Sequence, residues 1–99
     1  MDEKNAGKLQ IFAIEERESA AATCVVRCVG GIVRTGQRFD VGRDVIPAGE
    51  SHGVVTLDWI DRYGRRVDFV DPPHNAKVLF SGEGAPFLKE GATVTASDV

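Results

Sequence analysis

This chain has few residues suited to redox, metal or membrane chemistry. It contains 2 cysteines, 1 tryptophan, 1 tyrosine and 1 methionine among 99 residues. No apolar run approaches the roughly 18 residues of a membrane span, and residues 1–8 lack the apolar segment of a signal peptide. Lys and Arg total 12 against 15 Asp and Glu, so the net charge of −3 lacks the basic excess of a general nucleic-acid coat. We expect one soluble cytoplasmic domain without membrane contact.

The two cysteines favour a reducing compartment. If Cys24 and Cys28 share one strand, they lie roughly 13 Å apart along it, whereas a disulfide needs Cα atoms within about 7 Å. A metal site with His52 and His74 is the alternative, but zinc ligands come in closer pairs than these two histidines. Free cysteine packs as a small apolar residue, so we expect both thiols in the core and no metal.

β-Branched and aromatic residues bounded by Gly, Pro, Asp and Asn predict a chain of short strands. A helix over 14–25 is the alternative, but its charged first half lacks apolar residues at helical spacing. We expect a flexible tail over 1–8 and a single domain over 9–99. Short strands at this spacing indicate a sandwich or a small barrel, and a barrel removes exposed sheet edges. The predicted strands are 9–14, 22–29, 32–33, 37–41, 54–62, 66–70, 76–81 and 92–96, and the connections include a polar segment at 15–19 and loops at 42–53 and 82–91, the last with a turn at 86–88.

Trp59 is the only tryptophan. In a regular strand it shares one face with Val55 and Leu57. We expect that face to be the core side. The alternative is an outward Trp59 that forms an interaction patch with Ile60 or Tyr63.

Two blocks carry a family resemblance. Residues 24–41 read Cys-Val-Val-Arg-Cys-Val-Gly-Gly-Ile-Val-Arg-Thr-Gly-Gln-Arg-Phe-Asp-Val, and residues 72–82 read Pro-Pro-His-Asn-Ala-Lys-Val-Leu-Phe-Ser-Gly, followed by Gly91. Together with Phe12-Ala13-Ile14, the strand and glycine pattern resembles the second domain of translational GTPases of the elongation factor Tu type. The match runs in order over nearly the whole chain.

The resemblance implies an all-β fold, a small closed Greek-key β-barrel of six or more strands. The chain departs from the family pattern at Ser81, where the family has Arg, and in the loop 83–90, which is Lys/Arg-rich in the family. No Gly-x-x-x-x-Gly-Lys-Ser/Thr loop is present to bind a nucleotide. We therefore expect the barrel without its GTPase domain, no bound nucleotide and no cofactor.

The most distinctive cluster is a predicted hairpin tip with arginines around an aromatic ring. Arg62, Tyr63, Arg65 and Arg66 suit phosphate contacts and stacking on a base. Other arginines extend this surface if the fold brings them to the same face, namely Arg17, Arg27, Arg34, Arg38 and Arg43. Phe87 and Leu88 in the loop 82–91 are further contact candidates.

Other chemistries find weaker support. Asp58, Asp61, Asp68 and Asp71 flank the hairpin, and we expect them to pair with the arginines rather than act as paired acids. His52 and His74 fall in predicted loops, with no nucleophile elbow nearby. We expect a non-catalytic module that binds a protein or ribonucleoprotein. The alternatives are an RNA-binding protein, in which Arg27, Arg34, Arg62, Arg65 and Arg66 converge on one face, and a small enzyme or an accessory barrel of an enzyme, in which a deep pocket holds a histidine beside a carboxylate or Cys24.

Overall fold

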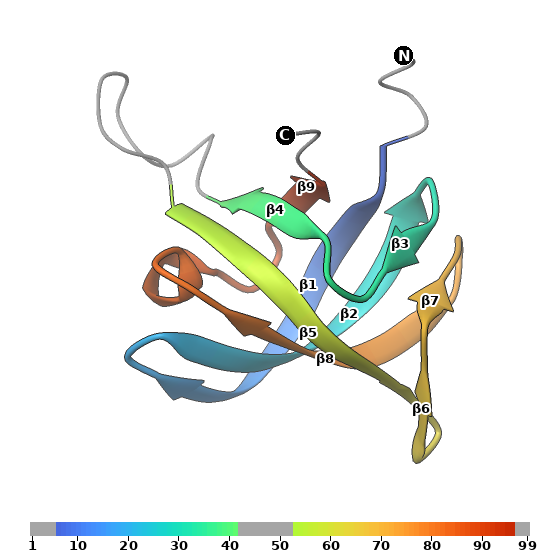
Figure 1. Ribbon diagram of the computed structural model, residues 1–99, viewed down its shortest axis with the longest axis horizontal. Helices are drawn as coiled ribbons and strands as arrows, with labels where there is room; N and C mark the ends of the chain where they lie inside the picture. Colours follow the sequence, from blue (N-terminus) through green and yellow to red (C-terminus); the bar gives the residue numbers. More distant parts are fainter. Residues whose placement is uncertain (1–5, 42–52, 97–99) are drawn as a thin grey trace.

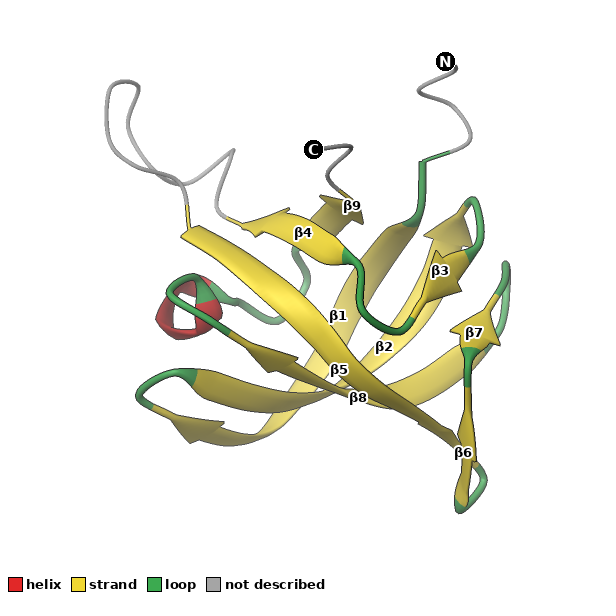
Figure 2. Ribbon diagram, viewed as in Figure 1, coloured by secondary structure: helices red, strands yellow, loops and turns green. Residues whose placement is uncertain are grey.

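The computed structural model describes residues 6–41 and 53–96, and these form strands joined by short turns (Figure 1). Within these described ranges, Figure 2 shows helix in a single turn. The elements are β1 (Lys8–Glu18), β2 (Ala21–Gly30), β3 (Val33–Arg34), β4 (Arg38–Val41), β5 (Gly53–Arg62), β6 (Arg65–Val67), β7 (Phe69–Val70), β8 (Asn75–Ser81), the 3₁₀ turn η2 (Ala85–Phe87) and β9 (Thr93–Ala96).

Six strands close into an antiparallel barrel. Their order is β4-β9-β1-β2-β8-β5, and pairing of β4 with β5 completes the ring. The barrel strands β4, β5 and β8 follow one another along the chain and lie side by side, and β9 returns to pair with β4. That arrangement is a Greek key. The prediction of a closed all-β barrel is therefore confirmed. β6 extends the sheet beyond the barrel, and β3 pairs with β7 in a separate two-stranded sheet.

The barrel interior is apolar. Alternate residues of each long strand point inward, and the rings of Phe39 and Phe80 meet edge to face with centroids 5.9 Å apart. Cys24 and Cys28 are fully buried in the same cluster, as predicted. No polar or charged residue of 6–41 and 53–96 is buried as a whole. β1 starts at Lys8; residues 1–5 of the tail expected over 1–8 lie outside the described part.

Burial should make both thiols unreactive. Desolvation raises the pKa of Cys24 from 9.0 to about 11, partly offset by the charge of Arg17, and desolvation also raises the pKa of Cys28. At about pH 8 the shift alone lowers the Cys24 thiolate fraction about a hundredfold. We expect a disulfide reagent such as Ellman's to label both thiols at once in urea and only very slowly in the native protein. Fast labelling of either native thiol would contradict this burial.

The raised pKa of Cys24 also makes the free energy of unfolding depend on pH. The folded state holds the Cys24 proton more tightly than the unfolded chain does. The stability that the protonated thiol contributes is therefore complete below pH 9.0 and is lost as the pH rises towards about 11.

The segment 15–19 differs from the prediction. It was expected as a polar connection, but β1 runs to Glu18 and pairs with β2 up to Glu18↔Ala21. The helix considered over 14–25 does not form, because these residues are strand apart from the turn between β1 and β2. The charged residues 15–18 of β1 lie where the hairpin extends past the core. Because neither face of the strand packs against the core there, apolar and polar residues do not alternate. Arg17 secures this end, because its guanidinium donates to the backbone oxygens of Ala85, Pro86 and Leu88 at 2.8–3.1 Å.

A β-bulge in β5 overturns the expected position of Trp59. Leu57 pairs with Phe80 and Trp59 with Leu79, so Asp58 is an extra residue on β5. The bulge shifts the inward–outward alternation by one residue. Val55, Leu57 and Ile60 are therefore fully buried, and Trp59 lies partly exposed on the outer face. A similar bulge in β1 between Ile11 and Ala13 accompanies Phe12, which is 45% exposed.

Within the described residues, no helix has the length and apolar character needed to cross a membrane.

Candidate binding surface

The β5–β6 hairpin closes with a two-residue turn at Tyr63-Gly64. Arg62 pairs with Arg65, and both turn residues have positive φ, 55° for Tyr63 and 83° for Gly64. These angles define a type I′ turn, whose twist matches that of the flanking strands. The N–H of Gly64 donates to Oδ1 of Asp61 at 2.9 Å, which holds the turn from within.

Tyr63 is an unusual residue for this position. Type I′ turns favour Asn, Asp or Gly. Other side chains crowd the backbone at positive φ, which costs about 1–2 kcal/mol in conformational free energy. Tyr63 is the only non-glycine residue of the described ranges with positive φ, and its side chain is 93% exposed. It therefore gains little from packing within the chain.

The hairpin arginines fall into two groups. Arg66 has two partners within the chain. Its guanidinium stacks 4.0 Å from the Trp59 ring centroid, and its Nε lies 3.7 Å from Oδ2 of Asp61. Arg62 lies 5.7 Å from the centroid of Tyr63, and its covered Nε has no hydrogen-bond partner among the described residues. Arg65 is exposed opposite Arg62, and like charges at such paired positions repel.

Strand pairing extends the hairpin surface across the outside of the barrel. Directly opposed residues in antiparallel strands share a face. The register therefore places Val25, Lys77, Asp61 and Arg66 in one transverse row. A second row holds Thr23, Leu79 and Trp59, and a third row begins with Arg27 and Asn75.

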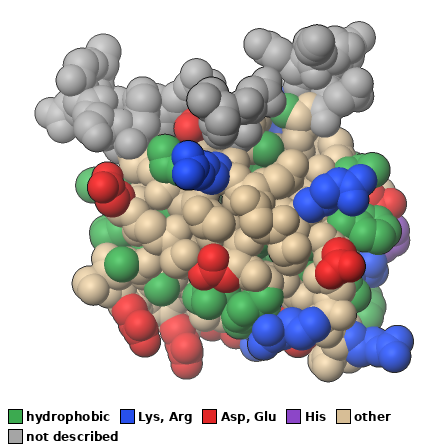
Figure 3. Space-filling view, viewed as in Figure 1, with side chains coloured by type: hydrophobic (Ala, Val, Ile, Leu, Met, Phe, Trp, Pro, Cys, Tyr) green, Lys and Arg blue, Asp and Glu red, His purple; other side chains and the backbone are tan. Residues whose placement is uncertain are grey.

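A groove of about 520 Å³ lies between the hairpin tip and β2; we call it the hairpin groove. It is lined by Val25, residues 61–64 and residues 75–77. Arg27 stands at its rim, where Nε contacts Oδ1 of Asn75 at 3.3 Å and the guanidinium lies 5.5 Å from the Phe12 ring centroid. In the view of Figure 3, several basic side chains gather towards the end of the molecule that carries β6 and β7.

The structure separates the other predicted contact residues from this groove. Arg34 lies on β3, opposite Phe69 of β7, and does not line the groove. Phe87 is 48% exposed in η2. Leu88 is only 2% exposed, so its prediction as a surface contact is wrong. It joins the core because the η2 turn directs the chain back onto the barrel.

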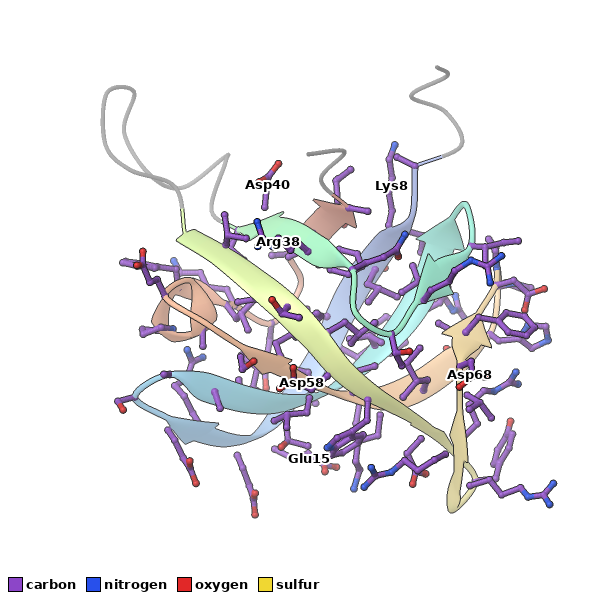
Figure 4. The ribbon with its side chains drawn as sticks, viewed as in Figure 1. Lys8, Glu15, Arg38, Asp40, Asp58 and Asp68 are labelled. Carbon is purple, nitrogen blue, oxygen red and sulfur yellow. The ribbon has the colours of Figure 1, made fainter. Side chains whose placement is uncertain are left out.

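The predicted acids and histidines are accounted for as follows. Asp61 pairs with Arg66, as expected, and Asp71 pairs with His74, whose Nδ1 lies 3.1 Å from Oδ1 of Asp71. His74 is exposed, whereas His52 lies outside the described residues. Asp58 and Asp68 are exposed (Figure 4). The described ranges hold no group of three or more His, Cys, Asp or Glu arranged to bind a metal.

A second groove of about 480 Å³ runs along the end of β1 beside residues 88–90. Three of its charged side chains, Arg17, Glu90 and Glu15, bond within the fold. Arg17 donates to three backbone oxygens, and Oε2 of Glu90 accepts from the N–H of Ile14 at 3.0 Å. Glu15 bonds Lys77 at 2.9 Å and raises the pKa of that lysine. This groove is better explained as a brace between β1 and the η2 segment than as a binding site.

Sequence reasoning missed four residues of the hairpin groove, namely Val25, Asn75, Ala76 and Lys77. Alternation along the predicted strands 22–29 and 76–81 identifies Val25 and Lys77 as outward-facing. It does not show that β8 lies between β2 and β5.

No protein-family model matches this sequence, and a search of curated proteins finds no match either.

Proposed function

We propose that the chain is a non-catalytic binding module that contacts a protein or ribonucleoprotein partner through the hairpin groove and the β5–β6 tip. The observation that carries this proposal is the exposed aromatic ring of Tyr63. This residue occupies a turn position with positive φ, a backbone conformation that is unfavourable for tyrosine. Strained positions that the fold does not need are concentrated at functional sites. Tyr and Arg are also the residues that most often dominate binding interfaces.

A non-catalytic role fits the state of the reactive groups. Both thiols are buried and protonated, so neither is a ready nucleophile. The His74–Asp71 pair lies exposed at the surface and lines neither groove.

We further propose that the barrel is of the elongation factor Tu second-domain type. In support, Gly31, Gly36, Gly82 and Gly91, the glycines at the turns of the resemblance, all have positive φ, between 57° and 131°. The family pattern has glycine at these positions, and residues with a side chain rarely adopt such angles. The backbone of these turns therefore fits the resemblance.

Replacing Tyr63 by asparagine separates binding from folding. Asparagine suits the first position of a type I′ turn, so the free energy of unfolding in urea should stay level or rise by up to about 1 kcal/mol. Partner capture from a lysate of the source cells should fall at least about tenfold, since the exposed ring is removed. Tyr63→Phe is the matched control and should retain capture. If Tyr63→Asn captures the same partner as the unmodified chain, the proposed surface is wrong.

RNA is the second candidate partner, because Arg27, Arg62 and Arg65 form no ion pair within the described residues. This candidate predicts that capture disappears after nuclease treatment and weakens steeply with salt. A partner that survives nuclease favours the protein.

A further inference from the structure

Arg62 and Arg65 lie on one face of the β5–β6 hairpin, which projects from the barrel (Figure 1). They are directly opposed, and opposed residues share a face. Residues alternate between faces along a strand, so Asp61 and Arg66 lie on the other face, where they pair with each other. Neither Arg62 nor Arg65 forms an ion pair among the described residues. This face of the tip therefore carries two positive charges without a carboxylate.

The guanidinium of Arg62 has unused donors. Its Nε is the one buried side-chain nitrogen or oxygen atom of the described residues that lacks a hydrogen-bond partner. Because Nε is covered, a ligand has to approach the two Nη atoms at the end of the group. No hydrogen bond or ion pair within 6–41 and 53–96 uses these two atoms. The end of a guanidinium presents parallel N–H donors that match two oxygens of one anion.

Two arginines at opposed positions suit an oxyanion with two charges. A carboxylate has one charge and two oxygens, which a single guanidinium matches. A phosphodiester link of a nucleic acid also has one charge, so it leaves one of the two arginines unmatched. A phosphomonoester carries about −1.5 to −2 charges at pH 7 and has three terminal oxygens, so it can accept from both arginines. Charge balance therefore favours a phosphomonoester.

We propose, resting on the function proposed above, that Arg62 and Arg65 form a site for a single phosphomonoester group. The ends of both guanidinium groups donate to its terminal oxygens. The exposed ring of Tyr63 packs against the group that carries the phosphate. Binding removes the repulsion between the two opposed arginines. The attraction is local: residues 61–66 hold three arginines and one aspartate, within a chain whose net charge is −3.

The test uses three small probes, namely phenyl phosphate, phenyl sulfate and inorganic phosphate. Phenyl sulfate has the same shape and the same number of terminal oxygens as phenyl phosphate but a single charge, and inorganic phosphate lacks the ring. Each probe is titrated into the isotope-labelled full chain at about pH 7.5, where the phosphate is doubly charged, and NMR follows the backbone amide signals of the tip.

The binding of phenyl phosphate is then compared in Arg62→Gln, Arg65→Gln and Arg38→Gln. Arg38→Gln is the matched control, because it removes the same charge from an exposed position of β4, which pairs with the opposite end of β5 (Figure 4). Urea unfolding of each variant verifies that the fold is retained.

Phenyl phosphate should shift the tip signals and bind at least about fivefold more tightly than phenyl sulfate or inorganic phosphate. Its affinity should fall at least about fivefold in Arg62→Gln and in Arg65→Gln and less than about twofold in Arg38→Gln. The proposal is overturned if phenyl phosphate leaves the tip signals unchanged, if either other probe binds as tightly, or if Arg38→Gln weakens binding as much as the tip variants.

Partner capture with and without phosphatase treatment of the lysate distinguishes the source of the phosphate. Loss of capture after phosphatase assigns the phosphate to the captured partner, whereas capture that persists while phenyl phosphate binds assigns the site to a free phosphomonoester. If phenyl phosphate does not bind but capture still depends on Tyr63, the phosphomonoester proposal fails alone. If phenyl phosphate does not bind and capture does not depend on Tyr63, both proposals fail.

Discussion

Replacing Phe80 by alanine should lower the free energy of unfolding by about 3–5 kcal/mol, the usual loss for a buried phenylalanine. Phe80 is fully buried on β8 and meets Phe39 of β4 edge to face. Its ring therefore links strands that are not neighbours in the barrel. A domain of this size has roughly 5–15 kcal/mol of stability in total, so urea denaturation should show a large shift or loss of the folded state.

Two further variants keep this prediction testable if the alanine protein does not fold. Phe80→Leu nearly conserves volume and should lose less than about 1.5–2 kcal/mol. Phe69→Ala removes the same ring from an exposed position, 47% exposed on β7, and should lose much less than Phe80→Ala. Equal losses for Phe69→Ala and Phe80→Ala would mean that the core does not depend on the inner ring pair.

Replacing Gly53 by alanine should lower the free energy of unfolding by about 1–3 kcal/mol or more, as overpacking usually does. A Cβ at Gly53 would overlap the Cα of Gly84, and a Cβ at Gly84 would come within 2.8 Å of the Gly53 carbonyl carbon. These contacts are backbone to backbone, so no flexible side chain can move aside. The N–H of Gly84 also donates to the Val54 oxygen at 3.2 Å, which ties the η2 segment to β5.

Gly30→Ala is the matched control for the glycine prediction. Its Cβ would lie 3.3 Å from Cδ of Lys8, a flexible atom of a half-buried side chain. We expect a change within about 1 kcal/mol, with part of any gain arising from a less flexible unfolded chain. If urea melts of Gly53→Ala and Gly30→Ala coincide, the close approach of β5 and η2 does not contribute to stability.

The candidate surface was only partly predictable. The tip at Arg62–Arg66 could be found because a turn signal and its flanking arginines are local in sequence. Asn75 could not be linked to Arg27, because these residues are 48 positions apart and meet only through pairing of β2 with β8. The stacking of Arg66 on Trp59 likewise depended on the outward position of Trp59.

By itself, the sequence determined that this protein is built from short strands around an apolar interior that includes both cysteines, and that its sharpest surface feature is an arginine-flanked Tyr63 turn. These properties follow from residue type and local alternation. Only the tertiary structure decided that Trp59 faces outward, that Leu88 is buried and that a groove joins β2, β8 and β5. The reason is physical: bulges change the phase of a strand by one residue, and strand order is set by contacts between distant segments, which local periodicity does not contain.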